Sequence, residues 1–209
     1  EYASYPLILT FLDEAEKDII LHARSFLMAK IPSDPSLEQM IPEDYKTFEQ
    51  YKVNLILDNS KQKGSPVVYV EDPSFQNLVG RIEYISKMGA LVTSFNLIRK
   101  GAFHQANGGY LIVDARKILL NLKSWDAIKS VIRTGEIKIT SLGQEFSLIS
   151  TVSLEPEAIP ADFKIIIIGD RLIYYLLAEY DLEFGELFKV SADFDDRIER
   201  TSENISNYS

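Results

Sequence analysis

Two runs of apolar residues, each followed closely by an aspartate, constrain the fold of this chain more than any other feature. The runs are YLIVD (110–114) and KIIIIGD (164–170). Uninterrupted apolar runs are typical of strands that are buried on both faces of a parallel sheet. The segment between them, residues 115–135, has the apolar spacing of a helix and ends in glycine, a common helix terminator. This order predicts an α/β fold in which residues 110–114 and 164–168 are neighbouring, buried, parallel strands.

Shorter patterns predict the other elements. Additional strands are predicted at residues 53–58, 66–71 and 187–194, and a further helix at residues 171–180. Two alternating runs within residues 136–152 turn at Leu142–Gln144, which predicts a β-hairpin. In residues 1–50, apolar residues recur at helical spacing until three prolines interrupt residues 31–45. We therefore predict a helical segment, 1–50, followed by an α/β core, 51–209.

Charge and composition exclude several classes of function. The 209 residues carry a net charge of −9, with a pI near 4.8. Because Lys and Arg side chains supply most of the affinity for nucleic acid, no nucleic-acid partner is expected. The sequence has no cysteine, so disulfides and thiolate metal sites are excluded. No apolar run approaches the roughly 18 residues of a membrane helix and no signal-peptide pattern opens the chain, so we expect no membrane partner and a cytoplasmic location.

The two aspartates that follow the apolar runs indicate chemistry at one edge of the sheet. In open α/β sheets, ligands bind outside the carboxyl ends of the strands. Asp114 and Asp170 would both lie at that edge, where their carboxylates suit Mg²⁺, a cation that takes oxygen ligands. The pattern therefore predicts a Mg²⁺-nucleotide site. The alternative is that both aspartates only terminate strands and cap the turns that follow.

Five segments, in order and at fitting distances, resemble one known family. They are GRIEY (80–84), MGALVTSFNLIRKGAFHQANGGYLIVDARKIL (88–119), LGQEFSLISTVSLEPEAIP (142–160), IIIIGDRLIYYLL (165–177) and ELFKVSADFDD (186–196). Together they resemble the ATPase region of the Lon-like ATP-dependent proteases, in the branch whose AAA+ module has a long helical insertion. The resemblance covers roughly residues 50–200, and residues 1–50 match more loosely, as the end of that insertion.

The resemblance implies a partial AAA+ fold of the P-loop NTPase type: a three-layer α/β sheet with an inserted β-hairpin, preceded by a helical segment. It also implies a parent protein that forms a hexameric homo-oligomeric ring, binds ATP and Mg²⁺, and threads protein substrates toward a serine–lysine peptidase domain. By this resemblance Asp114 is the Walker B aspartate that holds Mg²⁺, Asp170 is the sensor-1 residue near the γ-phosphate, and Lys189 stands near the arginine-finger position.

The chain departs from the family pattern at several points. It has no G-x-x-x-x-G-K-[ST] phosphate loop, which in the family lies upstream of the insertion, and no segment that resembles the serine–lysine domain. Ala115 replaces the glutamate that activates the attacking water, and Lys189 lacks the planar fork of arginine. We therefore expect no catalytic residue in this chain, and neither ATP nor Mg²⁺ bound to it alone. By the family pattern, Ala115→Glu in the parent would raise ATP turnover.

Two other functions stay open on the sequence alone. One is a non-hydrolysing scaffold or substrate-recognition ring, since both Ala115 and Lys189 weaken hydrolysis. The other is an AAA+ remodeller of the chelatase or helicase type, which shares the inserted hairpin, although the acidic charge weighs against a helicase. His104 is interpreted as a structural hydrogen-bonding residue in preference to a nucleotide or subunit contact, and residues 107–109 predict a tight turn.

Overall fold

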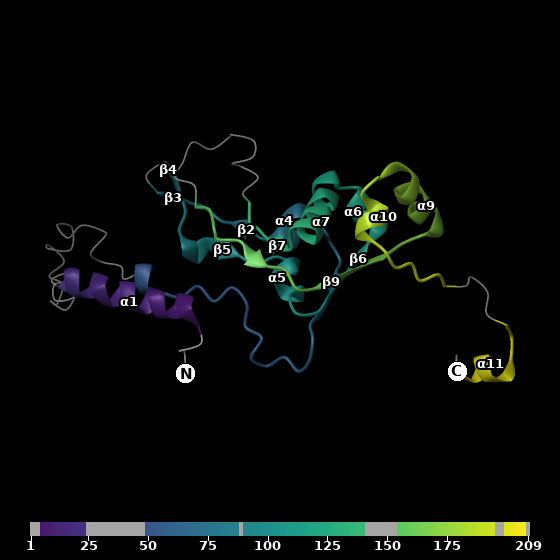
Figure 1. Cartoon of the computed structure of the whole chain (residues 1–209), viewed down its shortest axis with the longest axis horizontal. Helices are drawn as coiled ribbons and strands as arrows, with labels where there is room; N and C mark the ends of the chain where they lie inside the picture. The colour runs from purple at the N-terminus through teal and green to yellow at the C-terminus, as the bar shows by residue number, and fades with distance from the viewer. Residues whose placement is uncertain (1–4, 24–48, 88–89, 141–153, 195–198, 208–209) are drawn as a thin grey trace. The chain divides into compact units, whose positions relative to one another are not determined.

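The computed structural model describes residues 5–23, 49–87, 90–140, 154–194 and 199–207 (Figure 1). The chain separates into two compact units, Glu1–Leu55 and Ile56–Ser209. None of the described helices is long and apolar enough to cross a membrane.

The first unit contains one long helix, α1 (Pro6–Leu21), and a short 3-10 turn, η2 (Glu49–Tyr51). Helix α1 confirms the predicted helix over these residues, and residues 24–48 lie outside the described part of the chain. Asp18 joins the two elements, because its Oδ2 accepts hydrogen bonds from the Tyr51 hydroxyl at 2.6 Å and from Gln50 Nε2 at 3.0 Å. The hydrogen bond from Tyr51 is the main reason why the pKa of Asp18 lies below its usual value.

The second unit is built on a parallel sheet of three strands in the order β1 (Val67–Val70), β6 (Tyr110–Asp114), β9 (Lys164–Ile168). This pairing confirms that residues 110–114 and 164–168 are neighbouring parallel strands. The chain crosses the sheet in one direction, from β1 to β6 to β9. Right-handed crossovers therefore place both connections on the same face of the sheet.

Helices cover that face and form the core with it. They are α4 (Phe75–Val79), α5 (Ala102–Ala106), α6 (Ala115–Leu119), α7 (Leu122–Thr134), α9 (Arg171–Tyr180) and α10 (Phe184–Leu187). Leu111 and Val113 of the central strand are fully buried against Leu78, Phe103 and Ile128 from these helices. Each fully buried side chain of this size contributes about 1.5–3 kcal/mol to folding.

The opposite face of the sheet is apolar and exposed. Its exposed apolar side chains, which we call the bare face, are Val67, Tyr69, Tyr110, Ile166 and Ile168. The prediction that residues 164–168 are buried is therefore wrong, since Ile166 is 42% and Ile168 54% exposed. The physical reason is that β9 is an edge strand of the described sheet and the helices all pack on the other face. Only Ile165 and Ile167 therefore pack against the core.

Three pairs of short antiparallel strands lie outside the parallel sheet of the second unit. They are β2 (Arg81–Ile82) with β5 (Ile98–Arg99), β3 (Ile85–Lys87) with β4 (Ala90–Val92), and β7 (Glu136–Ile137) with β8 (Ile159–Pro160). A 3-10 turn, η3 (Phe95–Leu97), precedes β5, and α11 (Ser202–Asn207) lies near the end of the described chain. Ile82 of β2, Ile98 of β5 and Ile139 form a small second core, whereas Ile137 of β7 belongs to the main core.

The helix predicted for residues 115–135 is divided into α6 and α7. Asn121 leaves helical geometry between them, and its side chain accepts a hydrogen bond from the Ser124 N–H at 3.4 Å, so it caps the second helix. Gly135 ends α7 in the left-handed conformation, with φ of 67°, as expected of a terminating glycine. The sequence therefore predicted the end of this helix correctly but not the break within it.

Two predicted strands are absent from the structure, and one predicted hairpin is only partly described. Residues 53–58 and 187–194 form no strand, because neither segment pairs with another; α10 occupies the region just before the second of them. The turn of the hairpin predicted for residues 136–152 lies outside the described residues. The beginning of that segment, β7, pairs with β8.

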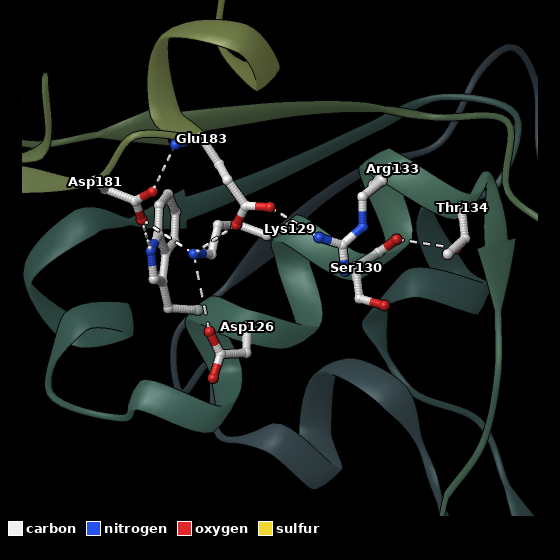
Figure 2. A network of polar contacts seen from close by, with 8 residues as sticks. Asp126, Lys129, Ser130, Arg133, Thr134, Asp181 and Glu183 are labelled. Carbon is white, nitrogen blue, oxygen red and sulfur yellow. Dashed lines mark hydrogen bonds and ion pairs between the residues drawn. The ribbon is translucent and has the colours of Figure 1, made fainter.

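A cluster of charged side chains joins α7 to the turn between α9 and α10 (Figure 2). Lys129 Nζ lies 3.2 Å from Asp181 Oδ2 and 3.0 Å from Glu183 Oε2. The Trp125 indole N–H donates a hydrogen bond to Asp181 Oδ2 at 2.7 Å. We call these four residues the Lys129 clamp. Burial alone would raise the pKa of Asp181, but the hydrogen bonds from Trp125 and Lys129 outweigh it and hold this pKa below its usual value.

We predict that the clamp stabilises the fold at neutral pH and loses this effect in acid. Because the pKa of Asp181 is lowered, its contribution is complete above the ordinary carboxyl pKa of about 4 and is lost as the pH falls below that value. Asp181→Asn should reduce the free energy of unfolding by about 1–3 kcal/mol at pH 7. Urea unfolding at several pH values, followed through the fluorescence of Trp125, the only tryptophan of the chain, measures this difference.

The matched control for this experiment is Asp126→Asn. Asp126 is 73% exposed and lies 4.0 Å from Lys129 Nζ, so its substitution should change stability little. A difference between wild type and Asp181→Asn that is equally large at pH 7 and well below pH 4 would contradict the prediction.

Candidate nucleotide-binding edge

Asp114 is the last residue of the central strand β6 and the N-cap of α6. Its Oδ1 accepts a hydrogen bond from the Lys117 N–H at 2.9 Å, which satisfies one of the free amides of the first helical turn. The Lys117 side chain turns back to the end of β1, where its Nζ donates to the Glu71 carbonyl at 2.8 Å. The Asp114 carboxylate is therefore held in place and half-buried at the carboxyl edge of the sheet.

Asp170 lies at the same edge. It follows β9 by two residues and is the N-cap of α9, with extended backbone geometry and no capping hydrogen bond from its side chain. The strand register pairs Asp114 with Ile168, so the two aspartates follow the ends of neighbouring strands. The structure thus brings together the two acidic residues that the sequence assigned to one edge. Asp170 is exposed, whereas Asp114 is partly covered.

Ala115 and Gly169 pack against each other between these aspartates. Ala115 is 4% exposed, and its Cβ lies 2.7 Å from the position that a Cβ on Gly169 would occupy. Two Cβ atoms do not approach so closely, so the strand ends can meet here only because residue 169 is glycine. A glutamate at position 115 would bring a carboxylate into this buried position. Burial of a charged group without a partner is strongly unfavourable. We therefore expect Ala115→Glu to destabilise the fold, and not to give the gain in turnover that the family pattern implies.

Lys189 is carried by a different element, the exposed coil that follows α10. The residue before it, Phe188, stacks on Trp125 with ring centroids 5.8 Å apart and an interplanar angle of 16°. The backbone next to Lys189 is therefore anchored on α7, while its own side chain is exposed.

The described residues contain no group of three His, Asp or Glu side chains that could hold a metal ion. Mg²⁺ at nucleotide sites has a different requirement, because one or two carboxylates suffice when phosphate oxygens and water complete the shell. Asp114 fits this requirement: Lys117 engages Oδ1, and no described residue donates a hydrogen bond to Oδ2.

The turn that leads into β6 is built as the sequence predicts. Gly108 has φ of 85°, a conformation that favours glycine, and a Cβ on Gly109 would lie 2.0 Å from the Pro66 carbonyl oxygen. His104, just before the turn, is 4% exposed, and its Nδ1 accepts a hydrogen bond from the Gly101 N–H at 3.2 Å. His104 therefore makes the structural hydrogen bond predicted for it.

A parallel sheet whose strands are followed by helices defines the class of open α/β modules, which bind ligands outside the carboxyl ends of their strands. Comparison with known proteins narrows this class. The family model described as LonB-like, AAA domain matches residues 63–195, well over half of the chain. The chain therefore belongs to the LonB-like AAA domain family, and its fold is a partial AAA+ module preceded by a helix.

A curated relative agrees with this family. The chain is similar to a putative Lon protease homolog from Escherichia coli (strain K12), with 22% identity over 194 residues. The match covers 86% of this chain and 32% of the relative. The chain thus spans about a third of the length of that protein.

Sequence reasoning missed two features of this region. The contact between Ala115 and Gly169 leaves only a weak signal, a glycine directly after an apolar strand, which is also common in ordinary turns. The Lys129 clamp leaves a weak signal too, since its residues are more than 50 positions apart in the pairs that matter. Both depend on tertiary contacts that no local pattern encodes.

We predict that Gly169→Ala destabilises the protein by about 1–3 kcal/mol, the usual range for overpacking. The added methyl group would overlap Ala115, so the double variant Gly169→Ala/Ala115→Gly should recover part of the loss. Urea unfolding of the wild type, both single variants and the double variant measures the effect. If the two substitutions are simply additive, the proposed contact does not limit the approach of β6 and β9.

We also predict that the buried His104 makes stability depend on pH. Burial lowers the pKa of His104, so its contribution is complete above the ordinary histidine pKa of about 6.5 and is lost as the pH falls below it. The free energy of unfolding should therefore fall as the pH is lowered below about 6.5. His104→Gln, which does not titrate, should show a smaller decline; equal slopes for the two proteins would contradict this role.

Proposed function

We propose that this chain is part of the AAA+ ATPase module of a Lon-like ATP-dependent serine protease. In this proposal the module binds Mg²⁺-ATP and assembles into a homo-oligomeric ring, a hexamer, that unfolds protein substrates and passes them to a serine–lysine peptidase domain. The observation that carries the proposal is the position of Asp114 at the carboxyl end of the central strand, beside the strand that leads to Asp170.

The exposed apolar side chains of the bare face favour a module that extends beyond the described strands and helices. The described strands follow one another in one direction across the sheet, so a right-handed crossover whose helix covers the bare face would run in the opposite direction. A strand that precedes β1 in the chain and pairs with the free edge of β9 would make such a crossover. The loop after that strand would then open at the carboxyl edge, at the N-terminus of the covering helix, where phosphate is bound best.

In this arrangement the residues of the chain have separate tasks. Asp114 would hold Mg²⁺ directly or through water, and the hydrogen bond from the Lys117 amide fixes the orientation of its carboxylate. Bound Mg²⁺ supplies positive charge that neutralises the phosphate oxygens. Asp170 responds to the γ-phosphate region, and Lys189 reaches toward the nucleotide of a neighbouring subunit. The chain alone lacks the phosphate loop, so we expect no appreciable ATP or Mg²⁺ binding to it in isolation.

The proteolytic part of the proposal rests on the relative described as a putative Lon protease homolog, of which this chain spans 32%. Peptide hydrolysis is assigned to a domain outside this sequence, so no residue of this chain is catalytic for it. Protein substrates, in a cytoplasmic setting, are the proposed partners. A nucleic-acid substrate is disfavoured by the net charge of −9.

The contact between Ala115 and Gly169 favours a second candidate function. The position of the usual general base holds a buried methyl group that packs on the next strand end. A module of this kind would bind nucleotide without efficient hydrolysis and act as a scaffold or substrate-recognition ring. Phosphate release by the full-length protein separates the two candidates, because the first requires nucleotide-dependent turnover and the second does not.

We predict that Asp114→Asn in the full-length protein weakens Mg²⁺-nucleotide binding about tenfold or more, or about 1.4 kcal/mol. Asparagine retains an oxygen that can cap α6, so the fold is kept while the charge that faces the metal is removed. Asp114→Ala removes both and should also lower stability by about 1 kcal/mol. Calorimetric titration with Mg²⁺-ATP, together with thermal unfolding, measures the two effects separately.

Asp162→Asn is the matched control, because Asp162 is an exposed aspartate just before β9, at the opposite end of this strand from Asp170. It should leave nucleotide affinity unchanged. If Asp114→Asn also leaves affinity unchanged while Asp114→Ala only lowers stability, Asp114 is a capping residue and the nucleotide assignment fails.

A further inference from the structure

The Lys129 clamp brings three charged side chains and one indole N–H together away from the sheet edge. Lys129 is 15% and Asp181 17% exposed, so both charges are largely removed from water. Asp181 uses its second oxygen as well, because Oδ1 accepts the Glu183 N–H at 3.0 Å and thereby fixes the turn before α10. Arg133, on the outside of the cluster, adds a 2.8 Å contact to Glu183 Oε1 (Figure 2).

Aromatic rings extend the clamp toward Lys189. Trp125 packs against Phe184 and Phe188, with centroids 6.3 and 5.8 Å away, and these two phenylalanine rings stack on each other at 5.3 Å. Tyr174 of α9 meets Phe184 edge to face at 5.8 Å. The indole of Trp125 thus holds the turn through its N–H and α10 through its ring. Lys189 is the first residue after this stack.

The segment held by the clamp has the two candidate nucleotide-responsive residues at its ends. Asp170 is the N-cap of α9, the clamp contacts the turn at Asp181 and Glu183, and Lys189 follows α10. The outer side of α9 is exposed, including Leu172 and Tyr175, so the segment is attached to the core through its inner side and the clamp. A shift of the clamp would therefore move the backbone of Lys189.

We propose that Lys129 is a positioning residue that fixes Lys189 for its action on a neighbouring subunit. This inference rests on the proposed nucleotide-binding ring. Lys129 acts through the two carboxylates on the α9–α10 turn, and Trp125 passes the constraint to Phe188. Without Lys129, Asp181 is left with a buried, unpaired charge, and the turn relaxes toward water. The backbone of Lys189 is then no longer held in one position, and neither is its side chain.

A double-mutant cycle in the full-length protein tests this role. The readout is the Mg²⁺-nucleotide concentration at which half of the protein is assembled, measured by analytical ultracentrifugation. Lys129→Met and Lys189→Ala should each raise this concentration by about tenfold, a size typical of coupled positions. The double variant should show no larger effect than either single variant, because both changes remove the same interaction. Lys129→Arg, which keeps the charge between the carboxylates, should restore most of the wild-type response.

Arg133→Gln is the matched control. It removes a contact to Glu183 from a side chain that is 61% exposed, and it should leave assembly unchanged. If Lys129→Met does not fold, Phe188→Leu replaces it in the cycle, because it removes the stack on Trp125 and leaves the ionic contacts in place.

The outcomes separate this inference from the proposed function. Additive effects of Lys129→Met and Lys189→Ala, or no effect of Lys129→Met, overturn the positioning role. The inference also fails, and the proposed function stands, if nucleotide binds with sensitivity to Asp114→Asn but does not promote assembly. A full-length protein that binds no nucleotide overturns both.

Discussion

Right-handed crossovers between β1, β6 and β9 place the connecting helices on one face of the sheet and leave the other face bare. The same strand topology determines the position of the candidate site as well as that of the core. Because the strands are parallel and adjacent, their carboxyl ends meet at one edge, and Asp114 and Asp170 follow two of those ends. The candidate nucleotide edge and the bare face are therefore two consequences of one topology.

Asp114 shows how a structural and a chemical role combine in one carboxylate. The strand-ending interpretation and the metal-binding interpretation were alternatives at the level of sequence, yet the geometry is compatible with both. Oδ1 caps α6 through the Lys117 amide, and this hydrogen bond fixes the rotation of the carboxylate. A side chain fixed in this way needs little reorganisation to accept a cation. The capping role therefore supports the binding role that we propose and does not compete with it.

Much of the fold was predictable because its main signal is local. The apolar runs at residues 110–114 and 164–168 predict neighbouring strands, and the helix-length connection between them predicts that β6 and β9 pair in parallel, as they do. The exposure of one face of β9 was not predictable, since an apolar run has the same sequence pattern whether its second face is covered or bare. The strand predicted at residues 187–194 failed for a related reason. Phe188 stacks on Trp125, and this distant partner outweighs the local alternating pattern.

The candidate site was predictable in identity but not in packing. Aspartates after apolar runs are visible in the sequence, and so is the alanine at position 115. The sequence did not indicate that Ala115 is buried against Gly169, because this contact joins residues from two strands. The contact changes the meaning of the alanine. In an open pocket, one substitution could restore a missing general base. Here the methyl group of Ala115 packs against Gly169 and helps to hold the two strand ends together.

In the proposed module, two features would separate the binding of nucleotide from its hydrolysis. At the edge, the carboxylate that suits Mg²⁺ is held in place, and the position of the general base is closed by packing. Between α9 and α10, Lys129 and the carboxylates of Asp181 and Glu183 fix the turn that leads to Lys189. In a ring of the proposed kind, occupancy of the site would be felt through Asp170, and the clamp would hold the group that contacts the next subunit. Such a ring would transmit the presence of nucleotide between subunits even if hydrolysis were slow, because the proposed coupling depends on positions and charges and not on an activated water.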